Sequence, residues 1–225
     1  MIVKLSYQKS DSIGVFAKLT NSFCIVSYDS PLSFYKTIKF ELYPKIPIIS
    51  TFISGSKCVG RFLVGNKRGL LVPDSIDSQE FKNLKNFLPD DVLIKKCDEK
   101  FSTLGNSVST NDYVALVNPE ISSQTTELIS DVLGVEVFKL SLGKKNLIGS
   151  YCIFNNNGGL IHPDMNQEEQ DEISSLLEIP LLTGTVNHGN KLIGASMLTN
   201  DFVTFCGTRT TQSELFIIET ALKRK

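Results

Sequence analysis

The side chains that could perform covalent chemistry in this 225-residue sequence are five cysteines and two histidines. A cysteine acts as a nucleophile when a histidine activates it, and both residue types bind zinc at suitable spacings. The cysteine number is odd and no C-x-x-C pair occurs, so neither a zinc site nor a disulfide framework is indicated. Apolar or β-branched neighbours in FCI, CVG, YCI and FCG favour buried, reduced thiols. The cysteines are Cys24, Cys58, Cys97, Cys152 and Cys206.

The basic residues are the second candidates, because lysine and arginine could neutralise the phosphates of a nucleic acid. The sequence holds 23 Lys and Arg against 24 Asp and Glu, a net charge of −1. Proteins that hold nucleic acid through many phosphates usually have a basic excess. We therefore expect a partner that is mainly protein, or basic residues gathered on one face. Short basic pairs stand at Lys67-Arg68, Lys95-Lys96 and Lys144-Lys145, and such pairs are usually solvated surface.

The composition indicates a globular chain outside the membrane. Hydrophobic residues make up 41% of the sequence, enough for a sizeable core. No stretch approaches the ~18 consecutive apolar residues of a membrane span, and the N-terminus lacks the apolar core of a signal peptide. We expect the protein in the cytosol or the nucleus.

The elements that position these residues repeat along the chain. A dipeptide of an aliphatic residue and a glycine occurs five times, with the glycines 44 to 46 residues apart. We call these the register glycines: Gly14, Gly60, Gly105, Gly149 and Gly194. Six residues after each of the last four register glycines stands an asparagine: Asn66, Asn111, Asn155 and Asn200. Thr20 occupies the same position after Gly14. Five units of this length account for the whole chain.

The same register predicts one capped helix in every unit. Seventeen residues after the glycine come Asp77, Ser122, Asn166 or Thr211, all good N-cap residues, and the first unit has Ser30 followed by Pro31. Three of these caps begin capping boxes, with glutamate three residues on. Each helix then carries an apolar i, i+4 pair on one face. The pairs are Ile38/Leu42, Leu84/Leu88, Ile129/Leu133, Ile173/Leu177 and Ile218/Leu222.

Short β-branched and aromatic runs, such as FCIVSY, GLLVP and YVALVNP, precede these helices, and runs such as IPIIST and VEVFKL follow them. Each unit is therefore predicted to contain a strand, a turn, a second strand, a helix and a third strand, in that order. One such unit cannot bury both faces alone, so we predict an α/β fold of five stacked units in a closed ring with pseudo-fivefold symmetry. The units run roughly 1–46, 47–91, 92–136, 137–180 and 181–225, in one domain. A propeller has a similar period but no helix.

The motifs also carry a family resemblance. FAKLTN, NDYVALV-x-P, GSYC-x-F, GGL-x-HP, DE-x-SSLL and the closing ND-x-x-x-FCG resemble the translation initiation factor 6 family, from Gly14 to Leu222. The resemblance implies the pentein fold, a five-unit ring. It also implies a factor without a cofactor that binds the joining face of the large ribosomal subunit and keeps the small subunit away.

The implied partners are a ribosomal protein beside the sarcin–ricin loop, with minor contact to ribosomal RNA, and a release GTPase with its cofactor protein. The resemblance further implies passage from nucleus and nucleolus to cytoplasm, and a monomer when off the ribosome. Eukaryotic relatives often carry a polar C-terminal tail. This chain stops at Lys225, which puts in doubt any regulation that depends on such a tail.

The residue after each register glycine is a candidate for the binding face. These residues are Val15, Arg61, Asn106, Ser150 and Ala195, and Arg61 and Asn106 break the symmetry as polar anchors. Tyr151 adds an amphipathic contact of a type enriched at interfaces. Four register glycines would admit a partner's backbone: Gly14, Gly105, Gly149 and Gly194. The family motifs VGR, LGN and GSYC point to the same residues. The alternative is that the glycines are turn residues and Arg61 is a surface charge.

Two further sets complete the predicted sites. Lys67 and Arg68, in what looks like a hairpin turn, are candidates for RNA contact at the edge of the site, with a shallow salt dependence expected. Ser174 and Ser175 follow an acidic run and match a serine pair that is reported to be phosphorylated in members of the family. The alternative is that both serines only occupy a helix, where a phosphate would destabilise the structure.

An enzyme is the rival hypothesis, because the pentein ring also hosts hydrolases and transferases of guanidino compounds with a Cys nucleophile and a His base. Cys206 is the cysteine placed where such a nucleophile could lie, and the bases available are His162 and His188. Spacing cannot exclude a pair that meets only in space. However, no His-x-Glu or His-x-Asp element is present, and the glycine-rich run around such a nucleophile is missing. We predict a protein that is not an enzyme.

Overall fold

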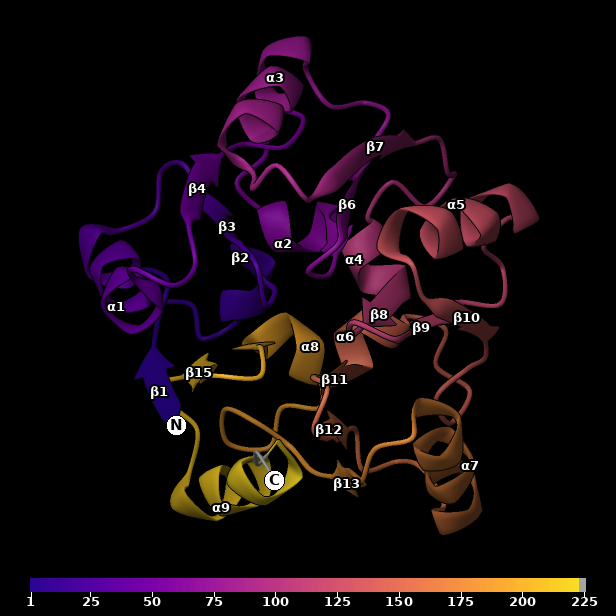
Figure 1. Cartoon of the computed structure of the whole chain (residues 1–225). Helices are drawn as coiled ribbons and strands as arrows, with labels where there is room; N and C mark the ends of the chain where they lie inside the picture. The colour runs from indigo at the N-terminus through magenta and orange to yellow at the C-terminus, as the bar shows by residue number, and fades with distance from the viewer. Residues whose placement is uncertain (223–225) are drawn as a thin grey trace.

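The computed structural model describes residues 1–222, and the predicted extension of the fifth unit to residue 225 lies outside that range. Figure 1 shows five α/β units around a common centre, with one long helix of each unit on the outside. The five repeated α/β units predicted from the register are confirmed. The outer helices are α1 (Leu32–Leu42), α3 (Ser78–Phe87), α5 (Ser123–Leu133), α7 (Gln167–Leu177) and α9 (Gln212–Ala221).

Four of the five predicted helix caps are confirmed. Asp77, Ser122, Asn166 and Thr211 each accept a backbone hydrogen bond at the start of their helix, and three of them form complete capping boxes. The cap assigned to Ser30 is wrong, since α1 has Pro31 at its N-cap without a side-chain bond. The reason is local, because the Ser30 hydroxyl donates to the Ser27 carbonyl in the preceding turn.

Every outer helix buries the predicted i, i+4 pair, and α3, α5 and α9 contact strands of the preceding unit's sheet. All ten side chains are less than 9% exposed, from Ile38 at 0% to Leu222 at 8%. They belong to five apolar clusters, each formed by an outer helix and strand residues of two neighbouring sheets. The core therefore lies between neighbouring units, as expected when one unit alone cannot bury both faces of its elements.

Each unit contains a three-stranded sheet with an antiparallel hairpin and a third strand parallel to the second. The hairpin turn expected around Lys67 and Arg68 is confirmed between two of these strands. The first four sheets run in chain order: β2 (Ala17–Leu19), β3 (Cys24–Ser27), β4 (Ile48–Thr51); β5 (Val64–Gly65), β6 (Gly69–Pro73), β7 (Leu93–Cys97); β8 (Val108–Thr110), β9 (Val114–Val117), β10 (Glu136–Lys139); β11 (Cys152–Phe154), β12 (Gly159–Ile161), β13 (Leu181–Thr183).

The fifth sheet takes its third strand from the other end of the chain. It consists of β14 (Met197–Thr199), β15 (Thr204–Gly207) and β1 (Ile2–Leu5), and β1 pairs with β15 in parallel from Ile2 opposite Thr204 to Leu5 opposite Gly207. Figure 1 shows β1 beside β15 and close to α9. The N-terminal strand thus joins the last unit to the first.

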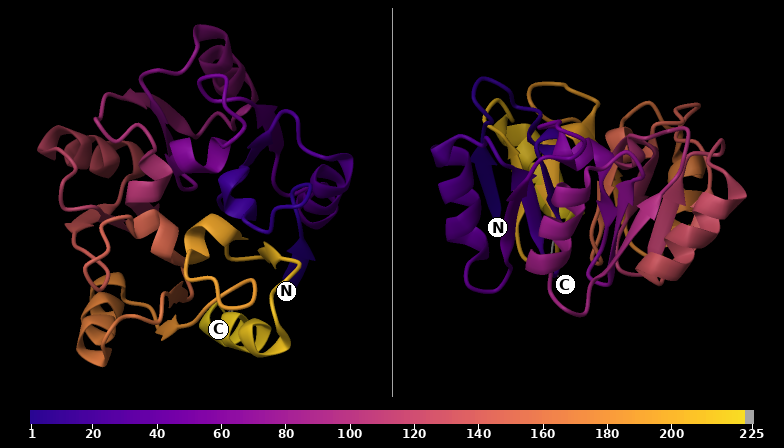
Figure 2. Two further views of the ribbon diagram at one scale, coloured as in Figure 1. Left: turned by 180° about the vertical axis from the view of Figure 1, so that it is seen from behind. Right: turned by 90° about the horizontal axis from the view of Figure 1, so that it is seen from above.

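Each unit also begins with a short helical turn, which periodicity did not predict. These turns are η1 (Ile13–Val15), α2 (Val59–Phe62), α4 (Leu104–Ser107), α6 (Ile148–Tyr151) and α8 (Ile193–Ser196). Three or four residues are too few to display a helical period. The turns lie innermost in both face views, and each contacts the next, with α8 returning to η1 (Figures 1 and 2). Among residues 1–222, no helix is both long and apolar enough to cross a membrane.

Candidate functional site

The register glycines allow the five short helical turns to meet around the centre. A Cβ on Gly105 would lie 2.9 Å from the carbonyl oxygen of Leu63 and 3.0 Å from that of Arg61, and the first distance is shorter than real Cβ atoms show. Corresponding contacts with the preceding unit surround the other four glycines. These glycines are buried against neighbouring backbone, so they serve contact between units and do not open the surface to a partner's backbone.

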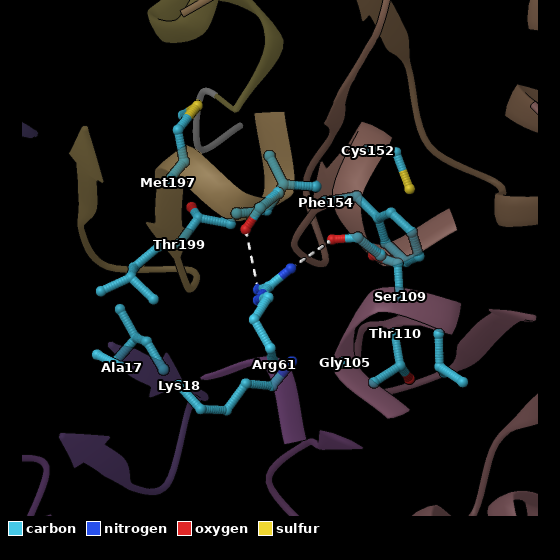
Figure 3. Close-up of a pocket in the computed structure, with 16 residues that line it drawn as sticks. Ala17, Lys18, Arg61, Gly105, Ser109, Thr110, Cys152, Phe154, Met197 and Thr199 are labelled. Carbon is cyan, nitrogen blue, oxygen red and sulfur yellow. Dashed lines mark hydrogen bonds between the residues drawn. The ribbon is translucent and has the colours of Figure 1, made fainter. Parts of the chain in front are cut away.

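Arg61 reaches from α2 across the centre. Its guanidinium donates to the carbonyl oxygens of three register glycines in other units, Gly14 at 3.2 Å, Gly149 at 3.1 Å and Gly194 at 3.1 Å. Figure 3 shows two of these bonds, with Arg61 between the turns of α6 and α8. Burial lowers the pKa of Arg61 to about 10, which leaves it charged at neutral pH. The broken symmetry at Arg61 thus has a structural cause, because one long side chain can satisfy carbonyls of several units.

Asn106 and Tyr151 lie on the neighbouring turns α4 and α6, which contact each other. The Asn106 side-chain oxygen accepts a 3.1 Å bond from the Ser150 hydroxyl, and the Tyr151 ring packs edge-on against His162 with centroids 5.3 Å apart. Both side chains are half-buried. Within residues 1–222, neither the Asn106 amide nitrogen nor the Tyr151 hydroxyl has a hydrogen-bond partner. The structure brings Arg61, Asn106 and Tyr151 together on three consecutive turns, and we call these turns, α2, α4 and α6, the short-helix end.

The asparagines of the register link the units at the other end of the hairpins. Each side-chain amide donates to the backbone carbonyl of the equivalent residue in the next unit, as Asn155 does to Asn200 at 3.0 Å. Each side-chain oxygen accepts two amide bonds from its own turn. Thr20 makes the turn bonds but cannot reach the next unit, and Ser22 replaces that link by donating to the Lys67 carbonyl at 3.0 Å.

Beyond the asparagines lies a polar ring that sequence reasoning missed. The carboxylates of Asp112 and Asp201 each accept from the side-chain amides of both Asn21 and Asn156, at 2.7 to 2.9 Å. Lys67 is 3.6 Å from Asp112, which closes the set. All five residues stand seven positions after a register glycine, and that uniformly polar register position was the signal in the sequence.

The structure places Lys67 and Arg68 away from the short-helix end. They lie in the turn between β5 and β6, at the far end of the hairpin from α2. Lys67 pairs with Asp112, and the Arg68 guanidinium donates to the carbonyl of Gly134 at the end of α5. Both are therefore engaged within the chain, and they do not form an edge of the cluster around Arg61.

Ser174 and Ser175 both lie in α7 but differ in accessibility. The half-buried Ser174 hydroxyl donates to the Ile179 carbonyl at 2.7 Å, as Ser130 does to Val135 at the same register position of the third unit. Ser175 is exposed and donates to the Asp171 carbonyl within the helix. Ser174 therefore helps to close the end of α7, and Ser175 is the more accessible of the two.

The thiols lack the features of a nucleophile. Cys206 is fully buried, and burial raises its pKa above the ordinary thiol value. Burial also raises the pKa of Cys24 and Cys152 to about 12. His162 is buried, bonded to the Leu142 carbonyl and the Asp164 amide. Burial predicted from apolar neighbours is confirmed for Cys24, Cys152 and Cys206 and is wrong for Cys58, which is half-buried at the start of α2. Cys97 is also buried, although its neighbours did not indicate it. In the described part of the chain, no group of three or more His, Cys, Asp or Glu residues could hold a metal ion.

Comparison with known proteins adds the identity. The sequence profile of the eIF-6 family matches residues 2–221. The chain belongs to the eIF-6 family. It is 47% identical to eukaryotic translation initiation factor 6 of Saccharomyces cerevisiae and 45% identical to that of Tetrahymena thermophila, in each case over 99% of this chain and 91% of the relative. It is 44% identical to eukaryotic translation initiation factor 6-2 of Arabidopsis thaliana over the same shares.

As a member of the eIF-6 family, this chain is a translation initiation factor. The names of its relatives refer to translation initiation and indicate no catalysed reaction. The resemblance read from the motifs is confirmed over the whole chain. Together with the buried Cys206, the family leaves the guanidino-enzyme hypothesis without support.

Proposed function

We propose that this protein binds the joining face of the large ribosomal subunit and prevents premature association with the small subunit. The observation that carries this proposal is the eIF-6 family match over residues 2–221. A protein of this size would act sterically, since it only has to occupy the surface that the small subunit needs.

We place the docking surface at the short-helix end, around Arg61, Asn106 and Tyr151. The three internal bonds of the Arg61 guanidinium fix the positions of the turns that form this surface. The Asn106 amide and the Tyr151 hydroxyl add donors without partners in residues 1–222. Half-buried donors on rigid backbone can pair with acceptors of a partner at small entropic cost. The nearby register glycines hold this surface in shape and do not contact the partner themselves.

The proposed partner at this surface is a ribosomal protein beside the sarcin–ricin loop, with minor contact to ribosomal RNA. The near-neutral charge supports a mainly protein partner, and binding should depend only weakly on salt. Release would require a GTPase and its cofactor protein. We further propose that the protein accompanies large subunits from nucleus and nucleolus to cytoplasm and is a monomer when unbound.

Sucrose-gradient sedimentation tests the function. Purified large subunits are incubated with the protein, small subunits are added, and the fraction of joined ribosomes is measured. We expect the protein to sediment with large subunits and to lower the joined fraction in proportion to its occupancy. A protein that binds large subunits but leaves joining unchanged would contradict the proposed activity.

Variants test the site separately from the function. Asn106→Ala and Tyr151→Ala should each weaken large-subunit binding by about 1–4 kcal/mol if they are interface hot spots. The matched control is Tyr113→Ala, which removes a 58% exposed aromatic ring from the opposite end of a hairpin. Arg61→Ala should also weaken binding, but its thermal unfolding must be compared because the side chain links four units. Normal binding by both Asn106→Ala and Tyr151→Ala would overturn the site and leave the function standing.

A further inference from the structure

A small cavity lies on the central axis beneath the short helical turns. Its volume is about 50 Å³, and its walls come from the inner strands β2, β8, β11 and β14 and from Arg61 above them. The lining surface is more polar than apolar, and it includes Ser109, Thr110 and Thr199 beside Ile153. We call this space the axial cavity (Figure 3).

Two cationic side chains line the axial cavity. Lys18 of β2 stands four residues after its register glycine, where the other units have Val64, Ser109, Ile153 and Leu198. It is therefore the one charged residue at that register position. Burial lowers the pKa of Lys18 to about 8, and the charge of Arg61 contributes to the same shift. Figure 3 shows the two side chains as neighbours.

No carboxylate compensates these charges at the cavity. Among the described residues that line it, none is Asp or Glu, and Lys18 has no hydrogen-bond or ion-pair partner within residues 1–222. The polar ring at the opposite end of the axis is different, since Lys67 there lies 3.6 Å from Asp112. Lys18 and Arg61 are half-buried, and like charges that are partly withdrawn from water repel each other. An unpaired ammonium beside a guanidinium therefore favours a counter-charge or the loss of a proton.

We propose that the axial cavity binds one small monatomic anion, such as chloride, between Lys18 and Arg61. The size fits, because a water-sized occupant needs roughly 10–15 Å³ of such space and the cavity offers about 50 Å³. Arg61 retains two N–H donors after its three carbonyl bonds, and the hydroxyls of Ser109, Thr110 and Thr199 line the same space.

Such an anion would bind the folded chain only, because the cavity requires strands from four units. It would therefore stabilise the fold by mass action. At a chloride concentration ten times the dissociation constant, the ratio of folded to unfolded protein should rise about tenfold. The inference concerns the interior of the fold and does not depend on ribosome binding.

The first experiment is thermal unfolding of the full chain in sodium chloride and in sodium gluconate at equal ionic strength. Wild type should melt at a higher temperature in chloride. Lys18→Met keeps the length of the side chain, removes its charge, and should abolish the difference between the two salts. Lys36→Met changes the net charge equally on the exposed face of α1 and should behave as wild type. An equal chloride response in Lys18→Met and wild type, or no response in wild type, would overturn the proposal.

The second experiment locates the ion in the unaltered protein. Crystals grown in sodium bromide should give an anomalous difference peak between Lys18 Nζ and the Arg61 guanidinium. A cavity without such a peak at saturating bromide would mean that Lys18 is accommodated by losing its proton, and the anion site would be wrong.

Discussion

Replacing Gly105 by alanine should destabilise the protein, although alanine is the better helix former. Gly105 lies in α4, where a Cβ would meet the carbonyl oxygens of Gly60, Leu63 and Arg61. All three are backbone atoms of the neighbouring unit, so no side chain can rotate away, and α4 must shift from α2. Arg61 is anchored to three other units and resists that shift.

The magnitude follows from two opposing effects. Alanine in a helix is favoured over glycine by about 1 kcal/mol. Overpacking a close contact costs about 1–3 kcal/mol and occasionally more. Because the clash involves three fixed oxygens, we expect the upper part of that range and a net loss of about 2 kcal/mol. For a chain of this length, the melting temperature should fall by roughly 4–8 °C.

Thermal and urea unfolding of the purified variant would measure this loss. The matched control is Ser107→Ala in the same short turn, where a buried hydroxyl has no hydrogen-bond partner within residues 1–222. That change should be neutral or stabilising by up to about 1 kcal/mol, since it removes an unsatisfied polar group. A Gly105→Ala protein as stable as wild type would refute the argument that the register glycines exist for contact between units.

Three further changes test other parts of the fold by chemical or thermal unfolding. Glu214 is buried, which would raise its pKa, but bonds from Thr211, Gly189, Thr185 and His188 outweigh burial and lower the pKa to about 2. Its carboxylate therefore stabilises the fold above the unfolded pKa of about 4.5, and this contribution is lost as pH falls from about 4.5 to 2. Glu214→Gln should thus cost up to about 3 kcal/mol near neutral pH, and equal losses at pH 7 and pH 2 would contradict this cause. Asn155→Ala should lower the free energy of unfolding by about 3 kcal/mol, because it removes both turn bonds and the bond to Asn200. Asn155→Thr should lower it by only about 1 kcal/mol, because threonine keeps the turn bonds, and identical losses in the two variants would exclude the link between units. Ser174→Ala should cost about 1 kcal/mol and Ser175→Ala less than about 0.5 kcal/mol, and the reverse order would show that the Ile179 bond is unimportant.

The sequence predicted the elements whose signals are local. The caps at Asp77, Asn166 and Thr211 followed from side chains that bond within four residues of themselves. The buried pairs of the outer helices followed from a period of 3.6 residues, which any solvent-exposed helix packed on one side must show. The short turns were not predicted, because four residues contain little more than one helical turn.

The candidate site was also predicted only in part from the sequence. The register identified Arg61 and Asn106 as departures from symmetry, with Tyr151 as an interface-type residue beside them, and the structure brings the three together on adjoining turns. The register did not show that the Arg61 guanidinium bonds to Gly14, Gly149 and Gly194, because those carbonyls are 47 to 133 positions from Arg61 in the chain and meet only at the axis. Lys18 was missed for the same reason, since nothing near it in the sequence marks it as buried.

By itself, then, the sequence determined the repeat, the capped helices, the buried faces and the family, because each depends on neighbours within one unit or on motifs along the chain. Only the tertiary structure decided how the units meet. It supplied β1 as the third strand of the last sheet, gave the register glycines their role at the contacts between units, and placed Lys18 and Arg61 at one cavity. These features depend on distances between residues far apart in the chain, and no local pattern records such distances.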